Sequence, residues 1–154
     1  MSDQNPAVSD TQPIRKPTIP KDAAVLVVED NVSNFVLIAR MLGYLGIHCE
    51  WKTSGYEVVE YADMLPRLDL ILMDIRLKGQ VDGIQAAEQI RTFADLPIIY
   101  LTAHSDDQTL ARAQQTEPHG YLLKPFEDRE LRLTIEIALY KHRMERQLRD
   151  NERW

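Results

Sequence analysis

The sequence predicts an α/β protein with a doubly wound, parallel, five-stranded sheet and an extended C-terminal helix. Two observations support this fold class. Short apolar runs rich in β-branched residues recur along the chain, as expected of strands that are covered on both faces. Each run is followed by a segment with helical periodicity, and strict alternation of this kind favours parallel strands joined by right-handed crossovers.

The individual elements follow from these runs and from the residues that bound them. Strands are expected at 24–28, 47–53, 68–73, 97–102 and 120–123. Helices are expected at 31–45, 54–65, 83–93, 105–115 and 128–151. Asn31 or Ser33 is predicted to cap the first helix and Gly46 to end it, while Ser105 is predicted to cap the fourth helix.

Composition indicates one globular domain flanked by two extensions. The chain has 154 residues, of which 44% are hydrophobic and 27% charged. Residues 1–21 contain four prolines and few large apolar side chains, so we expect a disordered N-terminal tail. Residues 22–140 should form the folded domain. Residues 141–154 should form a helical extension, which is typical of linkers to a further domain, so the chain is interpreted as a possible fragment.

Charge and cysteine content exclude several function classes. Residues 22–127 carry 16 acidic and 8 basic side chains, a net charge of −8, which argues against nucleic acid as a direct ligand. Cys49 is the only cysteine, so the chain can form no internal disulfide and no cysteine-based zinc site by itself. No apolar run is long enough to span a membrane, and residues 1–10 lack the features of a signal peptide. We therefore expect a cytoplasmic protein.

Polar side chains gather where the predicted strands end. Glu29 and Asp30 follow the first strand, Asp74 follows the third, Thr102 ends the fourth, and Lys124 follows the fifth. Ligands of doubly wound sheets bind at these carboxyl ends, so the five side chains should converge on one rim. Three carboxylates in one place repel each other unless a cation compensates them, and a set of oxygen ligands suits Mg²⁺.

The same rim can hold a phosphoryl group. Lys124, the hydroxyl of Thr102 and a bound cation together form a cradle for a tetrahedral dianion. The first strand is followed by an acidic loop and not by a glycine-rich phosphate loop, so the phosphate is not expected to belong to a bound nucleotide. A carboxylate nucleophile that accepts a phosphoryl group fits better, and Asp74 is the candidate because it ends the predicted central strand.

Several short motifs make the sequence resemble the receiver domain of two-component response regulators, which has a CheY-like, flavodoxin-like fold. The resemblance covers about residues 23–140. The motifs are Val27-Val28-Glu29-Asp30-Asn31, Leu72-Met73-Asp74, Asp82-Gly83, Leu101-Thr102-Ala103 and Gly120-Tyr121-Leu122-Leu123-Lys124-Pro125-Phe126.

The resemblance implies a phosphorylation switch, not an enzyme that acts on a separate substrate. Asp74 would take a phosphoryl group from a histidine of a sensor kinase or a phosphotransfer protein. The magnesium ligands would be Glu29, Asp30, Asp74 and the backbone carbonyl of Arg76.

Further roles follow from the same resemblance. Thr102 and Lys124 would bind the phosphoryl oxygens, and Thr102 and Tyr121 would form a switch pair. The Lys124–Pro125 bond is expected to be cis. Arg76 and His104 would modulate the rate of dephosphorylation. The output surface would comprise the helix at 105–115, the strand at 120–123 and the last helix, and it would control a partner or a downstream domain.

One loop departs from the family pattern. Residues 77–83 contain no proline and are one residue longer than the usual spacing between the phosphorylated aspartate and the Asp-Gly motif. The conformation of this loop, and the docking of the phosphoryl donor beside it, are therefore not given by the resemblance.

The last helix carries a repeat that predicts a coiled coil. Leu133, Ile137, Tyr140 and Met144 recur at 4-3-4 spacing, and Leu148 can extend the row. We expect either a parallel homodimer through this helix or a single solvated helix that frays after Tyr140. His119 and His142 are interpreted as isolated, since no pair of histidines has the sequence spacing of zinc ligands.

Three alternative functions use related folds or chemistry. A haloacid-dehalogenase-like phosphatase carries a second aspartate two residues after its nucleophile, where this chain has Arg76. A flavodoxin-like cofactor binder needs a hydroxyl-rich and glycine-rich loop where this chain has Glu29 and Asp30. A pseudo-receiver scaffold is disfavoured because every position of the phosphorylation site is filled.

Overall fold

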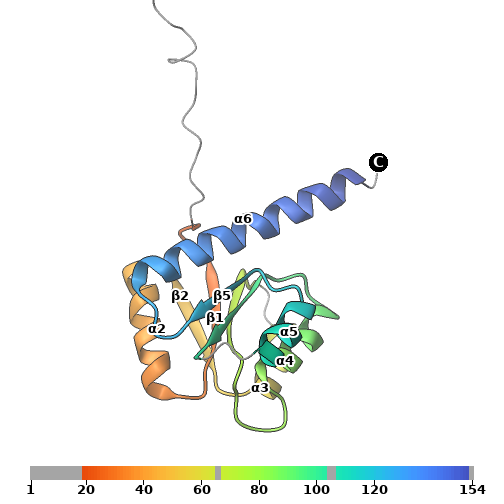
Figure 1. The fold of residues 1–154 in the computed structure, drawn as a ribbon. Coiled ribbons are helices and arrows are strands. Elements are labelled where there is room, and N and C mark those ends of the chain that lie inside the picture. The colour runs from red at the N-terminus through yellow and green to blue at the C-terminus, as the bar shows by residue number, and fades with distance from the viewer. Residues whose placement is uncertain (1–18, 65–66, 104–106, 153–154) are drawn as a thin grey trace, which may run out of the picture.

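The computed structural model describes residues 19–64, 67–103 and 107–152, in which five strands alternate with five helices (Figure 1). The strands are β1 (Ala24–Val28), β2 (His48–Lys52), β3 (Leu70–Asp74), β4 (Ile98–Thr102) and β5 (Gly120–Leu123). The helices are α2 (Val32–Tyr44), α3 (Gly55–Met64), α4 (Gly83–Arg91), α5 (Asp107–Gln115) and α6 (Asp128–Glu152). All strand pairs are parallel, and the order β2-β1-β3-β4-β5 confirms the predicted fold class.

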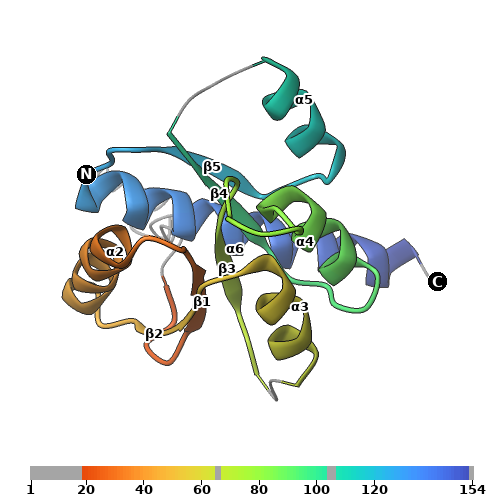
Figure 2. The same ribbon diagram turned by 90° about the horizontal axis from the view of Figure 1, so that it is seen from below.

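The sheet is covered on both faces, which explains why its strands lack polar alternation. Helices α2 and α6 lie on one face, and α3, α4 and α5 lie on the other (Figure 2). Successive residues of β1 point to opposite faces of the sheet. Val25 and Val27 pack with α2 and α6, whereas Leu26 and Val28 pack with α3 and α4. Two apolar cores therefore hold the three central strands in place.

The helix starts show how side chains fix the ends of elements. Asn31, and not Ser33, caps α2, because its side chain accepts a hydrogen bond from the amide of Asn34 at 3.0 Å. Asp82 and Gln85 form a reciprocal capping box at the start of α4. The predicted cap of the fourth helix, Ser105, lies outside the described residues, and that helix is described from Asp107.

The two extensions differ in how far the structure describes them. The predicted disordered tail falls largely on residues 1–18, which lie outside the described residues. The last helix, by contrast, runs unbroken from Asp128 to Glu152, so no structural boundary separates the domain from its extension at residue 140. None of the described helices combines the length and the apolar character needed to cross a bilayer.

Candidate phosphoacceptor site

The carboxyl ends of β1 and β3 place three carboxylates together. These strands pair directly, with Val28 opposite Met73, so Glu29, Asp30 and Asp74 emerge side by side at one edge of the sheet. One carboxylate oxygen from each of the three lies within 4.8 Å of the others. Glu29 is fully buried and Asp74 is 6% exposed, so the carboxylates form the floor of the rim.

Lys124 reaches across the rim and partly neutralises this cluster. Its Nζ lies 2.7 Å from Oε1 of Glu29 and 3.2 Å from Oδ2 of Asp74, and it donates a hydrogen bond to each. β5 positions it, because Thr102 and Leu123 are paired in register and the Lys124 amide donates to the Thr102 carbonyl. The Lys124–Pro125 peptide bond is cis, as expected from the sequence.

Burial and crowding change the acidity of the cluster. Burial, together with the neighbouring Glu29 carboxylate, raises the pKa of Asp74 to about 7, although Lys124 opposes the shift. Burial also acts to raise the pKa of Glu29, but its interactions with Asp74 and Lys124 outweigh burial and hold that pKa below its usual value. With the pKa of Asp74 at about 7 and that of Glu29 lowered, the two acids together hold about half a proton at pH 7 when no cation is bound.

The donor set fits a divalent cation. When all three carboxylates are ionised, Lys124 leaves two negative charges uncompensated. Oε2 of Glu29 is buried and accepts no hydrogen bond from any described residue, so it has an unused lone pair inside the cluster. Oxygen-only ligands with room for several waters are the preferred environment of Mg²⁺. Glu29, Asp30 and Asp74 would hold the ion here.

The loop that departs from the family pattern is tied to the same cluster. The amide of Lys78 donates a hydrogen bond of 2.9 Å to Oδ2 of Asp30, which fixes the loop across the rim. Gly83 then starts α4 directly against β3, and a Cβ at this position would lie 2.0 Å from the backbone oxygen of Asp74. The Asp-Gly motif is thus required for close packing beside Asp74.

Two aromatic residues support the site from behind, and the sequence analysis assigned them no role there. The indole N–H of Trp51 donates a hydrogen bond of 2.7 Å to the backbone carbonyl of Glu29. Its ring is stacked on Phe35 with 4.2 Å between the centroids. A tryptophan on the strand paired with β1 was the available signal, but sequence alone does not give the direction of its ring.

The predicted phosphate and switch residues occupy different environments. Thr102 ends β4 and is 8% exposed, beside the strand that carries Asp74. Tyr121 lies on β5 and is more exposed, with its ring 6.1 Å from that of Tyr100. The amide of Arg76 donates to Oδ1 of Asp74 at 3.1 Å. His104 lies outside the described residues.

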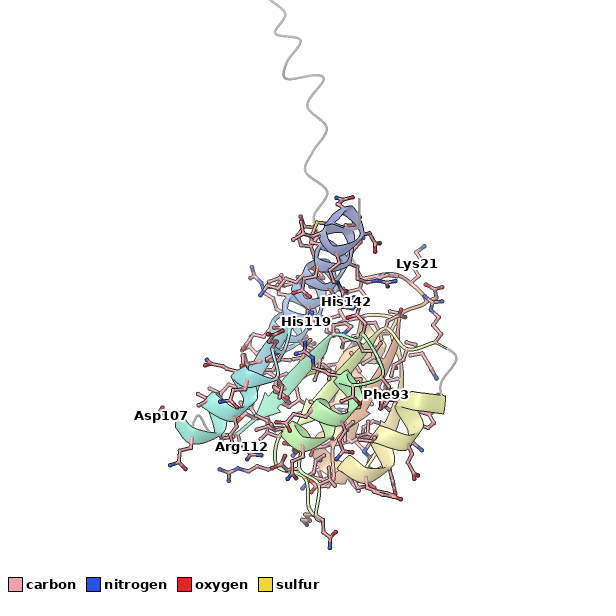
Figure 3. The ribbon with its side chains drawn as sticks, turned by 90° about the vertical axis from the view of Figure 1, so that its right-hand side faces the viewer. Lys21, Phe93, Asp107, Arg112, His119 and His142 are labelled. Atoms are coloured by element: carbon pink, nitrogen blue, oxygen red, sulfur yellow. The ribbon has the colours of Figure 1, made fainter. Side chains whose placement is uncertain are left out.

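The interpretation of His119 and His142 as isolated residues is wrong. Their rings lie 5.5 Å apart in an edge-to-face arrangement, because α6 passes over the start of β5 (Figure 3). Oε2 of Glu145 lies 3.1 Å from His119, and Oδ1 of Asp95 lies 3.1 Å from His142. The histidines are 23 positions apart along the chain, so local spacing gave no sign of this contact.

Comparison with known proteins places this site in a family. Residues 25–136 match the response regulator receiver domain family. The transcriptional regulatory protein YbdJ of Bacillus subtilis is 35% identical over 124 residues, which are 79% of this chain and 53% of YbdJ. The transcriptional regulatory protein PdtaR of Mycobacterium tuberculosis is 36% identical over 132 residues, 82% of this chain and 63% of PdtaR.

A solved structure supports the same assignment. The receiver domain of the sensor histidine kinase PA1611 from Pseudomonas aeruginosa PAO1, solved with a magnesium ion coordinated in its active-site cleft, has a TM-score of 0.71 and 34% identity. The match covers 77% of this chain and 98% of that domain.

The fold and the acidic rim therefore define a signal receiver module of two-component systems and not an enzyme of the usual kind. The chain belongs to the response regulator receiver domain family. It spans about half to two-thirds of the length of the two regulatory proteins compared here.

Proposed function

We propose that this domain is a phosphorylation switch that accepts a phosphoryl group on Asp74 with the help of Mg²⁺. The observation that carries the proposal is the buried cluster itself, with three carboxylates within 4.8 Å and the Lys124 ammonium 3.2 Å from Asp74. An oxygen of Asp74 would form a bond to phosphorus while the phosphorus–nitrogen bond of a donor phosphohistidine breaks. Mg²⁺ would neutralise the charge on the transferring group.

The surrounding side chains have distinct roles in this proposal. Lys124 and Thr102 bind the oxygens of the phosphoryl group, and the backbone carbonyl of Arg76 joins the three carboxylates as a metal ligand. The side chains of Arg76 and His104 would control the access of the water that hydrolyses the acyl phosphate. Thr102 connects the site to Tyr121, and the output surface is formed by α5, β5 and α6.

An apolar groove beside the rim is the expected docking place of the phosphoryl donor. It has a volume of about 350 Å³ and runs from Lys124 along α2, lined by Leu37, Ile38 and Phe126 among others. Leu37, on α2, is half-exposed and gives the groove an apolar wall that a partner can reach. Because Asp74 is nearly buried, a donor histidine has to approach over this rim, and the groove provides contact area there. The partner is a sensor histidine kinase or a phosphotransfer protein.

Phosphorylation by a small molecule tests the site without a partner. The protein is incubated with acetyl phosphate and Mg²⁺, and its intact mass is measured. We expect a gain of one phosphoryl group that disappears with a chelator or with Asp74→Asn. Asp22→Asn is the matched control, because Asp22 lies on the surface paired with Arg67. A gain that persists in Asp74→Asn would contradict the proposal.

A second experiment separates donor docking from the chemistry. Leu37→Glu should slow phosphoryl transfer from a phosphorylated sensor kinase but leave the reaction with acetyl phosphate unchanged, because Leu37 lines the groove and is half-exposed. Tyr44→Glu is the control, because Tyr44 is also exposed on α2 but lies at the opposite end of the helix from the rim. Equal slowing by the two variants would refute docking at the groove.

A further inference from the structure

The extended helix α6 has two apolar faces, and only one of them packs against the domain. The inner face carries Leu131, Ile135 and Ala138, which are fully buried, and His142 continues this row. The outer stripe consists of Leu133, Ile137, Tyr140, Met144 and Leu148, which are between 37% and 60% exposed. A helix that packs on one side of a sheet needs a single apolar face, so nothing among the described residues accounts for the outer stripe.

Contacts near its C-terminal end hold α6 against the domain. Asp95, which precedes β4, lies 3.1 Å from Nε2 of His142 and accepts a hydrogen bond of 2.6 Å from Arg149. Glu145 pairs with His119 at the start of β5 (Figure 3). These pairs are individually weak, but together they span two turns of the helix and fix its direction beyond the sheet. The outer stripe is therefore presented on an ordered helix that projects past the sheet (Figure 1).

We propose that the outer stripe is a dimerisation surface on which α6 of a second copy of this chain packs as a parallel, in-register, two-stranded coiled coil. The pattern places Ile137 and Met144 at the a positions of a heptad, with Leu133 and Tyr140 at the d positions. Ile137 at a combined with Leu133 at d is the combination that favours two parallel strands.

Polar residues of the same heptads match this arrangement. Asn151 falls at the next a position, where an asparagine pairs with its own copy only when the helices are parallel and in register. Glu136 and Lys141 occupy the g and e positions that face each other across a parallel pair, so two opposite-charge contacts form by symmetry. An antiparallel pair would place Asn151 beyond the start of the partner helix.

The proposed dimer is weak and forms without phosphorylation. The outer stripe spans only two to three heptads, so the helix pair buries less than the roughly 1,600 Å² of a standard interface. A dissociation constant on the order of micromolar is expected. The stripe is already exposed in the structure described here, so association does not depend on the proposed chemistry at Asp74.

Sedimentation equilibrium over about 1 µM to about 1 mM protein tests the association. The parent chain should show a monomer–dimer equilibrium, and Ile137→Glu should raise its dissociation constant at least tenfold. Arg146→Glu is the control, because Arg146 is exposed on the other side of α6 from the outer stripe. A monomer at every concentration, or equal effects of the two variants, would overturn the proposal. Both variants should still react with acetyl phosphate, which separates this test from that of the proposed function.

Cross-linking tests the orientation of the helices. In a Cys49→Ser background, Met144→Cys should form an intermolecular disulfide on mild oxidation, because a parallel in-register pair brings the two copies of position 144 together. Arg146→Cys should cross-link far less. An antiparallel pair would place position 144 opposite position 133, so equal and low yields for both variants at concentrations that give dimer would refute the parallel arrangement.

Discussion

Magnesium binding at the rim should release protons, because Asp74 is partly protonated near neutral pH when no cation is present. The pKa of Asp74 is raised to about 7 by burial and by the adjacent Glu29 carboxylate. A Mg²⁺ ion requires the ionised form of its carboxylate ligands, so it competes with that proton. We therefore vary the pH at constant ionic strength and measure the apparent affinity for Mg²⁺.

The size of the effect follows from the pKa. With a pKa of about 7, the ionised fraction of Asp74 falls from about nine-tenths at pH 8 to about one-tenth at pH 6. The apparent affinity for Mg²⁺ should therefore fall about tenfold over this range, which corresponds to about 1.4 kcal/mol. In Asp74→Asn this proton is absent, and the affinity should change less than about twofold between the same pH values.

The structure supplies an optical probe for this titration. Trp51 donates a hydrogen bond to the backbone carbonyl of Glu29 and is stacked on Phe35, so its fluorescence should respond when Glu29 binds the ion. Trp154→Phe removes the second tryptophan of the chain. Calorimetry in two buffers of different ionisation enthalpy counts the released protons directly. If the affinity for Mg²⁺ were equal at pH 6 and pH 8 and no proton were released, the raised pKa of Asp74 would be refuted.

The other predictions concern stability. Because the pKa of Asp74 lies above its usual 3.8, the folded state keeps a proton that the unfolded chain loses, so metal-free stability should fall as pH rises from about 4 to about 7. Asp74→Asn should raise the free energy of unfolding at pH 8 by about 1–3 kcal/mol in urea titrations without metal, and a decrease would contradict this sign. Gly83→Ala should lower it by about 1–3 kcal/mol, because the new Cβ would meet the Asp74 carbonyl. Gly43→Ala, with no atom within 4 Å of the new Cβ, should stabilise α2 by about 0.5–1 kcal/mol, and equal effects of the two alanines would refute the packing argument. Asp95→Ala should change global stability by less than about 1 kcal/mol but speed hydrogen exchange in α6 beyond His142, and unchanged exchange would show that Asp95 does not hold the helix.

The fold could be predicted because its determinants are local. Fully apolar runs such as 24–28 and 70–73 identify strands that are covered on both faces, and alternation with helices then fixes parallel pairing. The convergence of Glu29 and Asp74 could be predicted for the same reason, since parallel strands end at a common edge. The ends of the elements differ from the predictions by at most two residues, because side-chain caps decide where a helix begins.

The remaining features depend on contacts between distant segments. Local spacing does not show that the indole N–H of Trp51 donates a hydrogen bond to the backbone carbonyl of Glu29, because the direction of the ring depends on its stacking with Phe35. It also does not show the His119–His142 contact, because that depends on where α6 crosses β5. The periodicity of α6 predicts the outer stripe from the sequence. That the other face of α6 is the buried one follows only from its packing against the sheet.

Locating the transferred group on the chain shows which carboxylate accepts it. The protein is treated with acetyl phosphate and Mg²⁺, the acyl phosphate is trapped by reduction with borohydride, and the modified peptide is sequenced by mass spectrometry. The account predicts modification at Asp74 that requires the metal. Modification at another carboxylate, or equal labelling of Asp74 in the presence of a chelator, would contradict it.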